Sequence, residues 1–180
     1  MTSALVAASL VLCSVAAAAP ATWSPSVDGV RARLVVTPAT DAQRRPQLAI
    51  ALELENTSDV ANPLPISWGA YGDMVRFELE DEQGRVLPRL ALPGNELSPA
   101  PVTLQLPVAS TLHVQLTGNA IEYVPNGKAL LRPLVFPGWD LPAKPGKLYL
   151  RATFTPATPA TTTDRRALAH PLVLPRVQLP

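Results

Sequence analysis

Two segments of the chain alternate apolar with small or charged side chains, and this alternation constrains the fold more than any other feature. The segments are residues 47–56 and 74–81. Successive side chains of a β-strand point to opposite faces, so a period of two puts every apolar side chain of a segment on one face. These inward positions are Leu48, Ile50, Leu52 and Leu54 in the first segment and Val75, Phe77 and Leu79 in the second. The pattern predicts two half-buried strands.

Shorter segments with strand character follow, and no long segment has helical periodicity. The chain has 21 prolines, and its nine glycines lie at apparent turns, a composition typical of all-β domains. The candidate strands are residues 30–37, 47–55, 64–68, 74–80, 85–90, 103–106, 111–116, 129–135, 147–154 and 168–179, the third broken by Pro65 and the last by Pro171 and Pro175. We expect an all-β fold, an immunoglobulin-like antiparallel β-sandwich of about seven to nine strands, with a barrel as the alternative.

Two hairpins are expected within this fold. Residues 30–37 and 47–55 are predicted to pair around a centre near residue 42, which would place Arg31 opposite Glu53. The second hairpin is predicted around a turn at residues 81–84, with residues 74–80 and 85–90 as its arms. The outward acids Glu53, Glu55, Glu78 and Glu80 lack the spacing of a calcium loop, so we interpret them as solvated strand faces.

The first 21 residues have the character of a secretory signal peptide. They carry no charged side chain, are apolar over residues 4–19 and end in Ala19-Pro20-Ala21, a small-x-small pattern. The apolar run is shorter than the roughly 20 residues that span a bilayer. We expect a periplasmic or secreted protein without stable membrane insertion after cleavage; cleavage after Ala18 or Ala21 and retention as an uncleaved anchor stay open.

The mature part, residues 22–180, is expected to form a single domain. A chain of about 160 residues buries on the order of 70% of its unfolded surface, which is enough for one core. The only cysteine, Cys13, lies in the predicted signal, where lipid attachment is an alternative. Cleavage would leave neither disulfides nor thiolate metal sites.

The remaining residues exclude several function classes. A formal net charge of +1 gives no electrostatic basis for binding nucleic acid. His113 and His170 are the only imidazoles, neither lies in a catalytic motif, and no Gly-x-Ser-x-Gly elbow occurs. We interpret both as ordinary surface histidines. We therefore expect no enzyme activity, no metal and no cofactor.

The most site-like segment is the loop from Trp68 to Asp73. An aromatic ring beside flexible glycines and a carboxylate is a combination used in sugar recognition, and Trp139 could supply a second platform. The candidate ligand-binding residues are Trp68, Tyr71, Asp73 and Trp139. Trp68 also sits where sandwich domains place a core tryptophan, and we favour that interpretation. Exposed rings would support glycan binding, and buried rings would support a structural role.

Four pieces follow one another along the chain: Leu52-Glu-Leu-Glu-Asn-Thr-Ser-Asp59, Phe77-Glu-Leu-Glu-Asp-Glu-Gln-Gly84-Arg85-Val86, Trp139 and Pro145-Gly-Lys-Leu-Tyr149. With these pieces, residues 48–154 resemble bacterial immunoglobulin-like domains of the intracellular proteinase inhibitor type. The resemblance implies a β-sandwich and raises protease inhibition as a function. This chain departs from that family in its predicted secretory signal, and no inhibitory loop residue can be carried over.

These observations together predict an exported, non-catalytic β-sandwich with a binding or structural role in the bacterial cell envelope. Its partner would be a protein or a glycan that the sequence does not identify. A secreted protease inhibitor and a carbohydrate-binding module are the alternatives.

Overall fold

The computed structural model describes residues 21–40, 46–66, 74–89, 102–117, 121–124, 128–131, 139, 141, 146–157 and 167–179. These residues form eleven strands, which confirms the all-β prediction. The strands are β1 (Val30–Thr40), β2 (Pro46–Asn56), β3 (Asn62–Ile66), β4 (Val75–Glu80), β5 (Val102–Leu106), β6 (Thr111–Thr117), β7 (Ile121–Val124), β8 (Lys128–Leu131), β9 (Tyr149–Phe154), β10 (Leu172–Val173) and β11 (Val177–Gln178).

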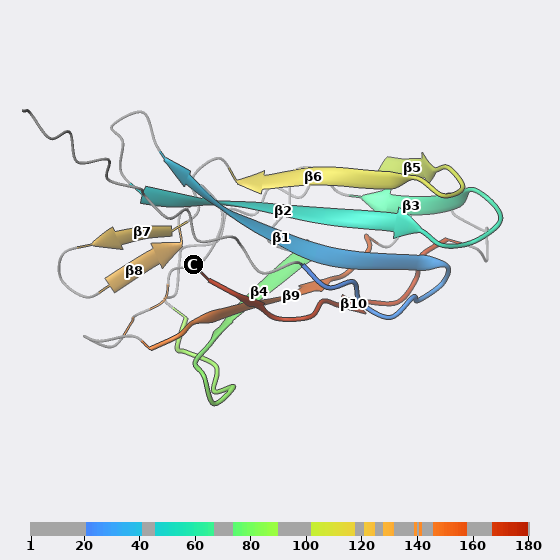
Figure 1. Ribbon diagram of the computed structural model, residues 1–180. Coiled ribbons are helices and arrows are strands. Elements are labelled where there is room, and N and C mark those ends of the chain that lie inside the picture. Colours follow the sequence, from blue (N-terminus) through green and yellow to red (C-terminus); the bar gives the residue numbers. More distant parts are fainter. Residues whose placement is uncertain are drawn as a thin grey trace, which may run out of the picture.

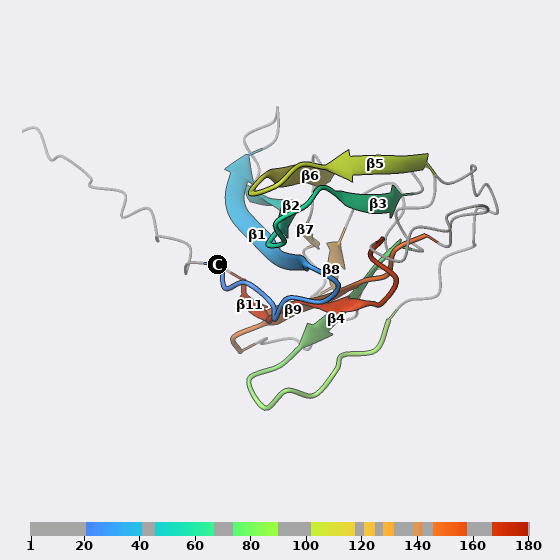
Figure 2. The ribbon, with the colours of Figure 1, turned by 90° about the vertical axis from the view of Figure 1, so that its right-hand side faces the viewer.

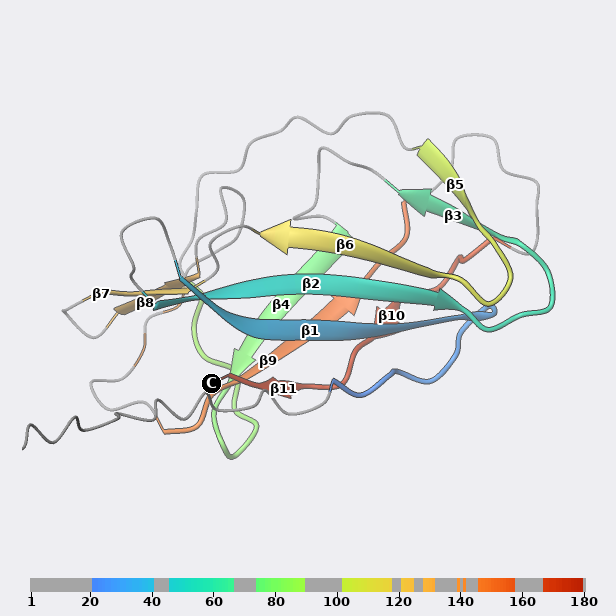
Figure 3. The ribbon, with the colours of Figure 1, turned by 45° about the horizontal axis from the view of Figure 1, so that its top comes forward.

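The strands are arranged in two main layers. The first sheet has the order β1-β2-β6, and the pair β3-β5 lies beside it in the same layer (Figures 1 and 2). In the second sheet β9 is central, with β4 on one side and both β10 and β11 on the other. Figure 3 shows β9 and β4 crossing beneath the long β1-β2 pair. All described strand pairs are antiparallel.

The core lies between the two layers and contains the predicted inward side chains. Leu48, Ile50, Leu52 and Leu54 of β2 and Val75, Phe77 and Leu79 of β4 are each at most 5% exposed. Phe154, Leu150 and Leu172 of the second sheet belong to the same apolar cluster. Burial of one such side chain contributes about 1.5 to 3 kcal/mol, so the two alternating segments are main sources of stability.

The register of the first hairpin differs from the prediction by two residues. Arg31 pairs with Glu55 and Arg33 pairs with Glu53, so the predicted partnership of Arg31 with Glu53 is wrong. A shift of two residues keeps every side chain on its face, which is why alternation alone could not distinguish the registers. The observed register gives each arginine an acid, whereas the predicted one would place Arg33 opposite Ala51.

The second hairpin is correct at its turn and wrong in its second arm. Gly84 N donates to Asp81 O at 3.0 Å, and Gly84 has a φ of 76°, a left-handed value that favours glycine. Beyond the turn, Val86 makes an isolated bridge to Glu80, and Leu87 N donates to Leu79 O at 2.8 Å. Arg89 makes its isolated bridge to Trp139 and not to β4. Pro88 has no N–H to continue the ladder, so the described part of residues 85–90 forms no strand.

The C-terminal segment is interrupted by prolines as predicted. β10 and β11 pair with the same edge of β9, and residues 174–176 between them leave the regular ladder. Leu174 N still donates to Ala152 O at 2.9 Å, but Pro175 has no donor. Residues 174–176 therefore form a short loop beside β9, and this loop becomes one wall of the site described below.

Candidate functional site

The four ligand-binding residues predicted from the sequence fall into two groups. Trp68, Tyr71 and Asp73 lie outside the described residues, so a sugar site there stays a prediction. Trp139 is only 1% exposed and belongs to the apolar core. Its ring therefore has no exposed face on which a sugar could stack. The structure thus does not bring Trp139 to a surface site, and its burial matches the structural alternative.

The outer face of the first sheet carries a row of closely paired charges. Arg33 Nε donates to Glu53 Oε2 at 2.6 Å, and Arg31 Nη2 lies 2.8 Å from Glu55 Oε2. His113 of β6 continues the row, with its Nδ1 3.2 Å from Glu53 Oε1. We call these five side chains, together with Trp23, the Trp23 face. Glu53 and Glu55 are therefore ion-paired rather than freely solvated.

Trp23 reaches this face because the residue after it is fixed to the edge of β1. Ser24 N donates to Ala32 O at 2.8 Å, and Ala32 N donates to Ser24 Oγ at 3.0 Å. The guanidinium carbons of Arg31 and Arg33 lie 4.8 and 4.4 Å from the centre of the Trp23 ring. Cation–π contact of this kind holds an arginine in place. Sequence reasoning missed Trp23, although the spacing of the two arginines puts both on one face of β1.

The pKa of Glu53 reflects this close pairing. Burial by itself would raise the pKa of the carboxyl, but hydrogen bonds from Arg33 and His113 outweigh it, and the net result is a pKa below the ordinary value of 4.5. The charged form of Glu53 is thus stabilised in the folded protein.

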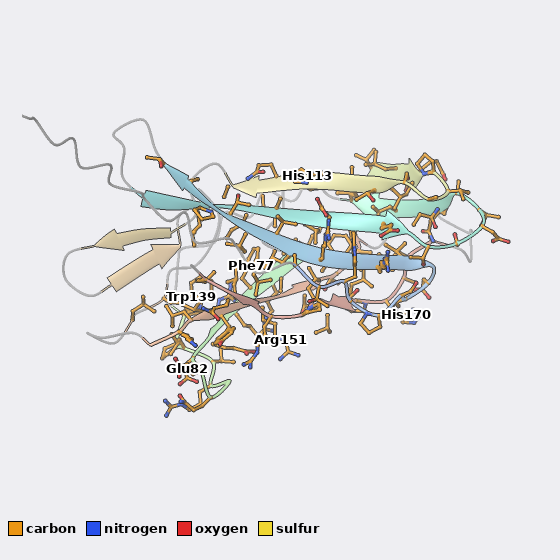
Figure 4. The ribbon with its side chains drawn as sticks, viewed as in Figure 1. Phe77, Glu82, His113, Trp139, Arg151 and His170 are labelled. Atoms are coloured by element: carbon orange, nitrogen blue, oxygen red, sulfur yellow. The ribbon has the colours of Figure 1, made fainter. Side chains whose placement is uncertain are left out.

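The outer face of the second sheet contains a surface hollow of about 310 Å³. It is lined by Glu80, Arg151, Val173, Leu174, Pro175 and Arg176. We call it the Glu80 hollow. Alternation places Glu80 at the outward end of β4 and Arg151 outward from β9, while residues 174–176 form the wall on the other side of β9. Figure 4 shows Arg151 pointing away from the first sheet, on the opposite side of the molecule from His113.

Glu80 is the buried charge of this hollow, and its two partners are distant. The residue is 4% exposed, which overturns the prediction of a solvated Glu80. Arg151 Nη1 lies 3.4 Å from Glu80 Oε1, and Arg176 Nη1 lies 3.7 Å from Oε2. The side chains of Arg151 and Arg176 are 46% and 47% exposed. Glu80 points outward as expected, but the two arginines and the loop at Pro175 cover it.

The two arginines of the hollow use few of their hydrogen-bond donors. A guanidinium has five N–H donors, and an ideal pair with a carboxylate forms two parallel bonds near 2.8 Å. Among the residues that the structure describes, Arg151 makes one long hydrogen bond of 3.4 Å, to Glu80, and Arg176 makes none within 3.5 Å. Arg176 also stacks on Tyr149, with 4.5 Å between the guanidinium carbon and the ring centre. The arrangement can therefore receive an additional anion. No sequence motif indicates this site, because its residues come from three separate segments of the chain.

The second histidine joins the two ends of the described fold. Asp28 Oδ2 accepts from the backbone of Ala169 at 3.1 Å and of His170 at 3.2 Å, and it lies 2.8 Å from His170 Nδ1. The contact to the His170 side chain is the main cause that lowers the pKa of Asp28 below 3.8. This contact is a structural tie between the first turn and the segment before β10.

Asn56 begins the sequence Asn-Thr-Ser, which matches the pattern of an N-glycosylation site. In the structure it is a buried residue with a structural role. It is 1% exposed, and its Nδ2 donates to the carbonyls of Val60, Leu106 and Pro107 at 2.8, 2.9 and 3.2 Å. Its Oδ1 accepts from Ser58 N at 2.9 Å. These bonds hold the β2-β3 and β5-β6 connections together, and the folded chain does not present this amide for glycosylation.

Comparisons with known proteins identify no relative of this chain. No protein-family model, curated protein or solved structure matches this chain. Within the described residues, no group of three or more His, Cys, Asp or Glu side chains is placed to hold a metal ion. The same part of the chain contains no helix that is both long and apolar enough to cross a membrane.

Proposed function

We propose that this chain is an exported, immunoglobulin-like β-sandwich protein that acts by binding, without catalysis, in the bacterial periplasm or outside the cell. The Glu80 hollow is the observation that carries the binding role. It presents two half-exposed arginines with unused donors on the outer face of a firmly packed sheet. A preformed cationic recess on a rigid element suits recognition of an anionic group.

The support for export is the sequence of residues 1–21, which is apolar, carries no charged side chain and ends in Ala19-Pro20-Ala21. Trp23 and Ser24, directly after the proposed cleavage site at Ala21, already contact residues of β1. Protease inhibition and glycan binding remain the alternatives, and no contact among the described residues favours either.

Export is tested by expressing the full chain in a Gram-negative bacterium, fractionating the cells and sequencing the N-terminus of the purified protein. We expect the protein in the periplasm or the medium, beginning at Thr22 or, for the other cleavage site, at Ala19. A cytoplasmic chain that retains residues 1–21 would contradict the proposal.

Binding is tested by immobilising residues 22–180 and capturing envelope proteins from the native host. The matched control is the Arg151→Gln/Arg176→Gln variant, whose folding is checked by circular dichroism. We expect partners that the wild-type protein retains and an unrelated β-domain does not, and reduced retention by the variant. Absence of any specific partner on the wild-type protein would count against a binding role.

A further inference from the structure

We propose that the Glu80 hollow binds the C-terminal carboxylate of a partner peptide whose last residue is apolar. This inference rests on the proposed binding function and names the ligand class of the same site. It follows from the charge of the hollow, from the geometry of its two arginines and from the apolar side chains beside them.

The charge of the hollow favours an added anion. Arg151 and Arg176 both face the single carboxylate of Glu80, which leaves one positive charge in excess. On the same outer face, Arg76 Nη2 lies 3.4 Å from Glu78 Oε1, so these two charges largely offset each other. Glu78 also stands opposite Arg151 in the strand register, but it lies outside the lining of the hollow.

The acids of the adjoining turn are engaged elsewhere and do not neutralise the hollow. Asp81 Oδ2 accepts from Arg85 Nε at 2.6 Å. Glu82 Oε1 accepts from the backbone N–H of Lys147 at 3.1 Å. The excess positive charge therefore stays with the two arginines that line the hollow.

The geometry of the arginines suits a carboxylate held between them. Arg176 is oriented by its stacking on Tyr149, and Arg151 projects from the regular part of β9. Both lie at long distances from Glu80, with their remaining N–H groups on half-exposed side chains. A carboxylate has two acceptor oxygens, so one group can accept from both guanidinium groups at once.

The wall of the hollow supplies an apolar contact next to the charge. Val173 is 48% exposed and Pro175 also lines the hollow, whereas Leu174 between them is 1% exposed and belongs to the core. A volume of about 310 Å³ is enough for an end group and one side chain. At a peptide C-terminus the carboxylate and the last side chain share one Cα atom. An internal aspartate has no apolar side chain on its own Cα atom, so it would offer a carboxylate without the adjacent apolar group.

The test uses acetyl-Ser-Gly-Ala-Val with a free C-terminal carboxylate and the same peptide as its C-terminal amide. Each is titrated into ¹⁵N-labelled residues 22–180, and NMR shifts of the arginine Nε–H groups are followed. We expect the free acid to shift the signals of Arg151 and Arg176 and to bind at least about tenfold more tightly than the amide. Arg151→Gln and Arg176→Gln should each weaken binding by at least about tenfold, whereas Arg76→Gln should change it less than about twofold.

Further arms separate the alternatives. Arg151→Lys and Arg176→Lys keep the charge and serve if a glutamine variant fails to fold; they should restore only part of the affinity. Equal binding of acid and amide, or unchanged binding by the folded variants, would overturn the proposal. Equally tight binding of acetate or of a peptide amide with an internal aspartate would remove the C-terminal specificity. Loss of peptide binding with envelope partners still captured would leave the broader binding function standing.

Discussion

The two outer faces of the molecule use the same residue types in different ways. On the Trp23 face each arginine has its own glutamate, at 2.6 and 2.8 Å, and an indole ring beneath both. In the Glu80 hollow two arginines share one glutamate, at 3.4 and 3.7 Å, and within the described part of the chain an aromatic ring contacts only Arg176. On the Trp23 face the arginines are closely paired within the protein, whereas the arginines of the Glu80 hollow have unused N–H donors.

This difference separates a structural role from a recognition role. Short, mutually satisfied pairs fix the register of β1 and β2 and leave little for a ligand to gain. Long contacts around a buried acid contribute little to folding, because desolvation of the carboxylate offsets the attraction. They leave guanidinium groups that a ligand can use. Pair geometry therefore distinguishes the two faces better than composition does.

The largest expected difference between the faces concerns their aromatic residues. Trp23→Ala removes a ring that lies under two guanidinium groups and next to the anchored Ser24, so we expect a loss of about 2 kcal/mol in the free energy of unfolding. Tyr149→Ala removes a ring under Arg176 alone and should cost about 1 kcal/mol. Urea denaturation of both variants measures the difference. If Tyr149→Ala lowered the free energy of unfolding as much as Trp23→Ala or more, the proposed difference between the two faces would be contradicted.

The sequence predicted the strands well and the candidate site poorly, for physical reasons. A period of two assigns Leu52 and Phe77 to the core whatever the register, and Pro175 lacks the N–H that a ladder position with an inward donor needs. Neither rule says which distant strands become neighbours. Arg151 and Glu80 meet only because β4 pairs with β9, and that pairing depends on the packing of the whole core.

The glutamates give the next comparison. Glu53→Gln weakens two close contacts, to Arg33 and His113, and should cost about 1 kcal/mol. Glu80→Gln removes a more buried charge with more distant partners, and its half-exposed arginines can hydrate, so we expect a change below about 0.5 kcal/mol or a small gain. Chemical denaturation of the two variants under identical conditions decides this. A markedly larger loss for Glu80→Gln would show that Glu80 is a structural ion pair like those of the Trp23 face.

The smallest expected effect is the pH dependence of the stability that the Trp23 face contributes. The pKa of Glu53 lies below 4.5 in the folded protein, because hydrogen bonds from Arg33 and His113 outweigh its burial. A carboxyl whose pKa is lower in the folded than in the unfolded state contributes stability that is present above the unfolded value and lost as pH falls through the folded value. The free energy of unfolding of the wild-type protein should therefore decrease as the pH is lowered below about 4.5, and Glu53→Gln should flatten this decline.

Denaturation curves between pH 6 and pH 3 measure this decline, with Arg33→Gln as the matched control, since loss of that partner returns the pKa of Glu53 towards 4.5. An unchanged decline in both variants would mean that the close pairing seen on this face does not stabilise the charged form of Glu53.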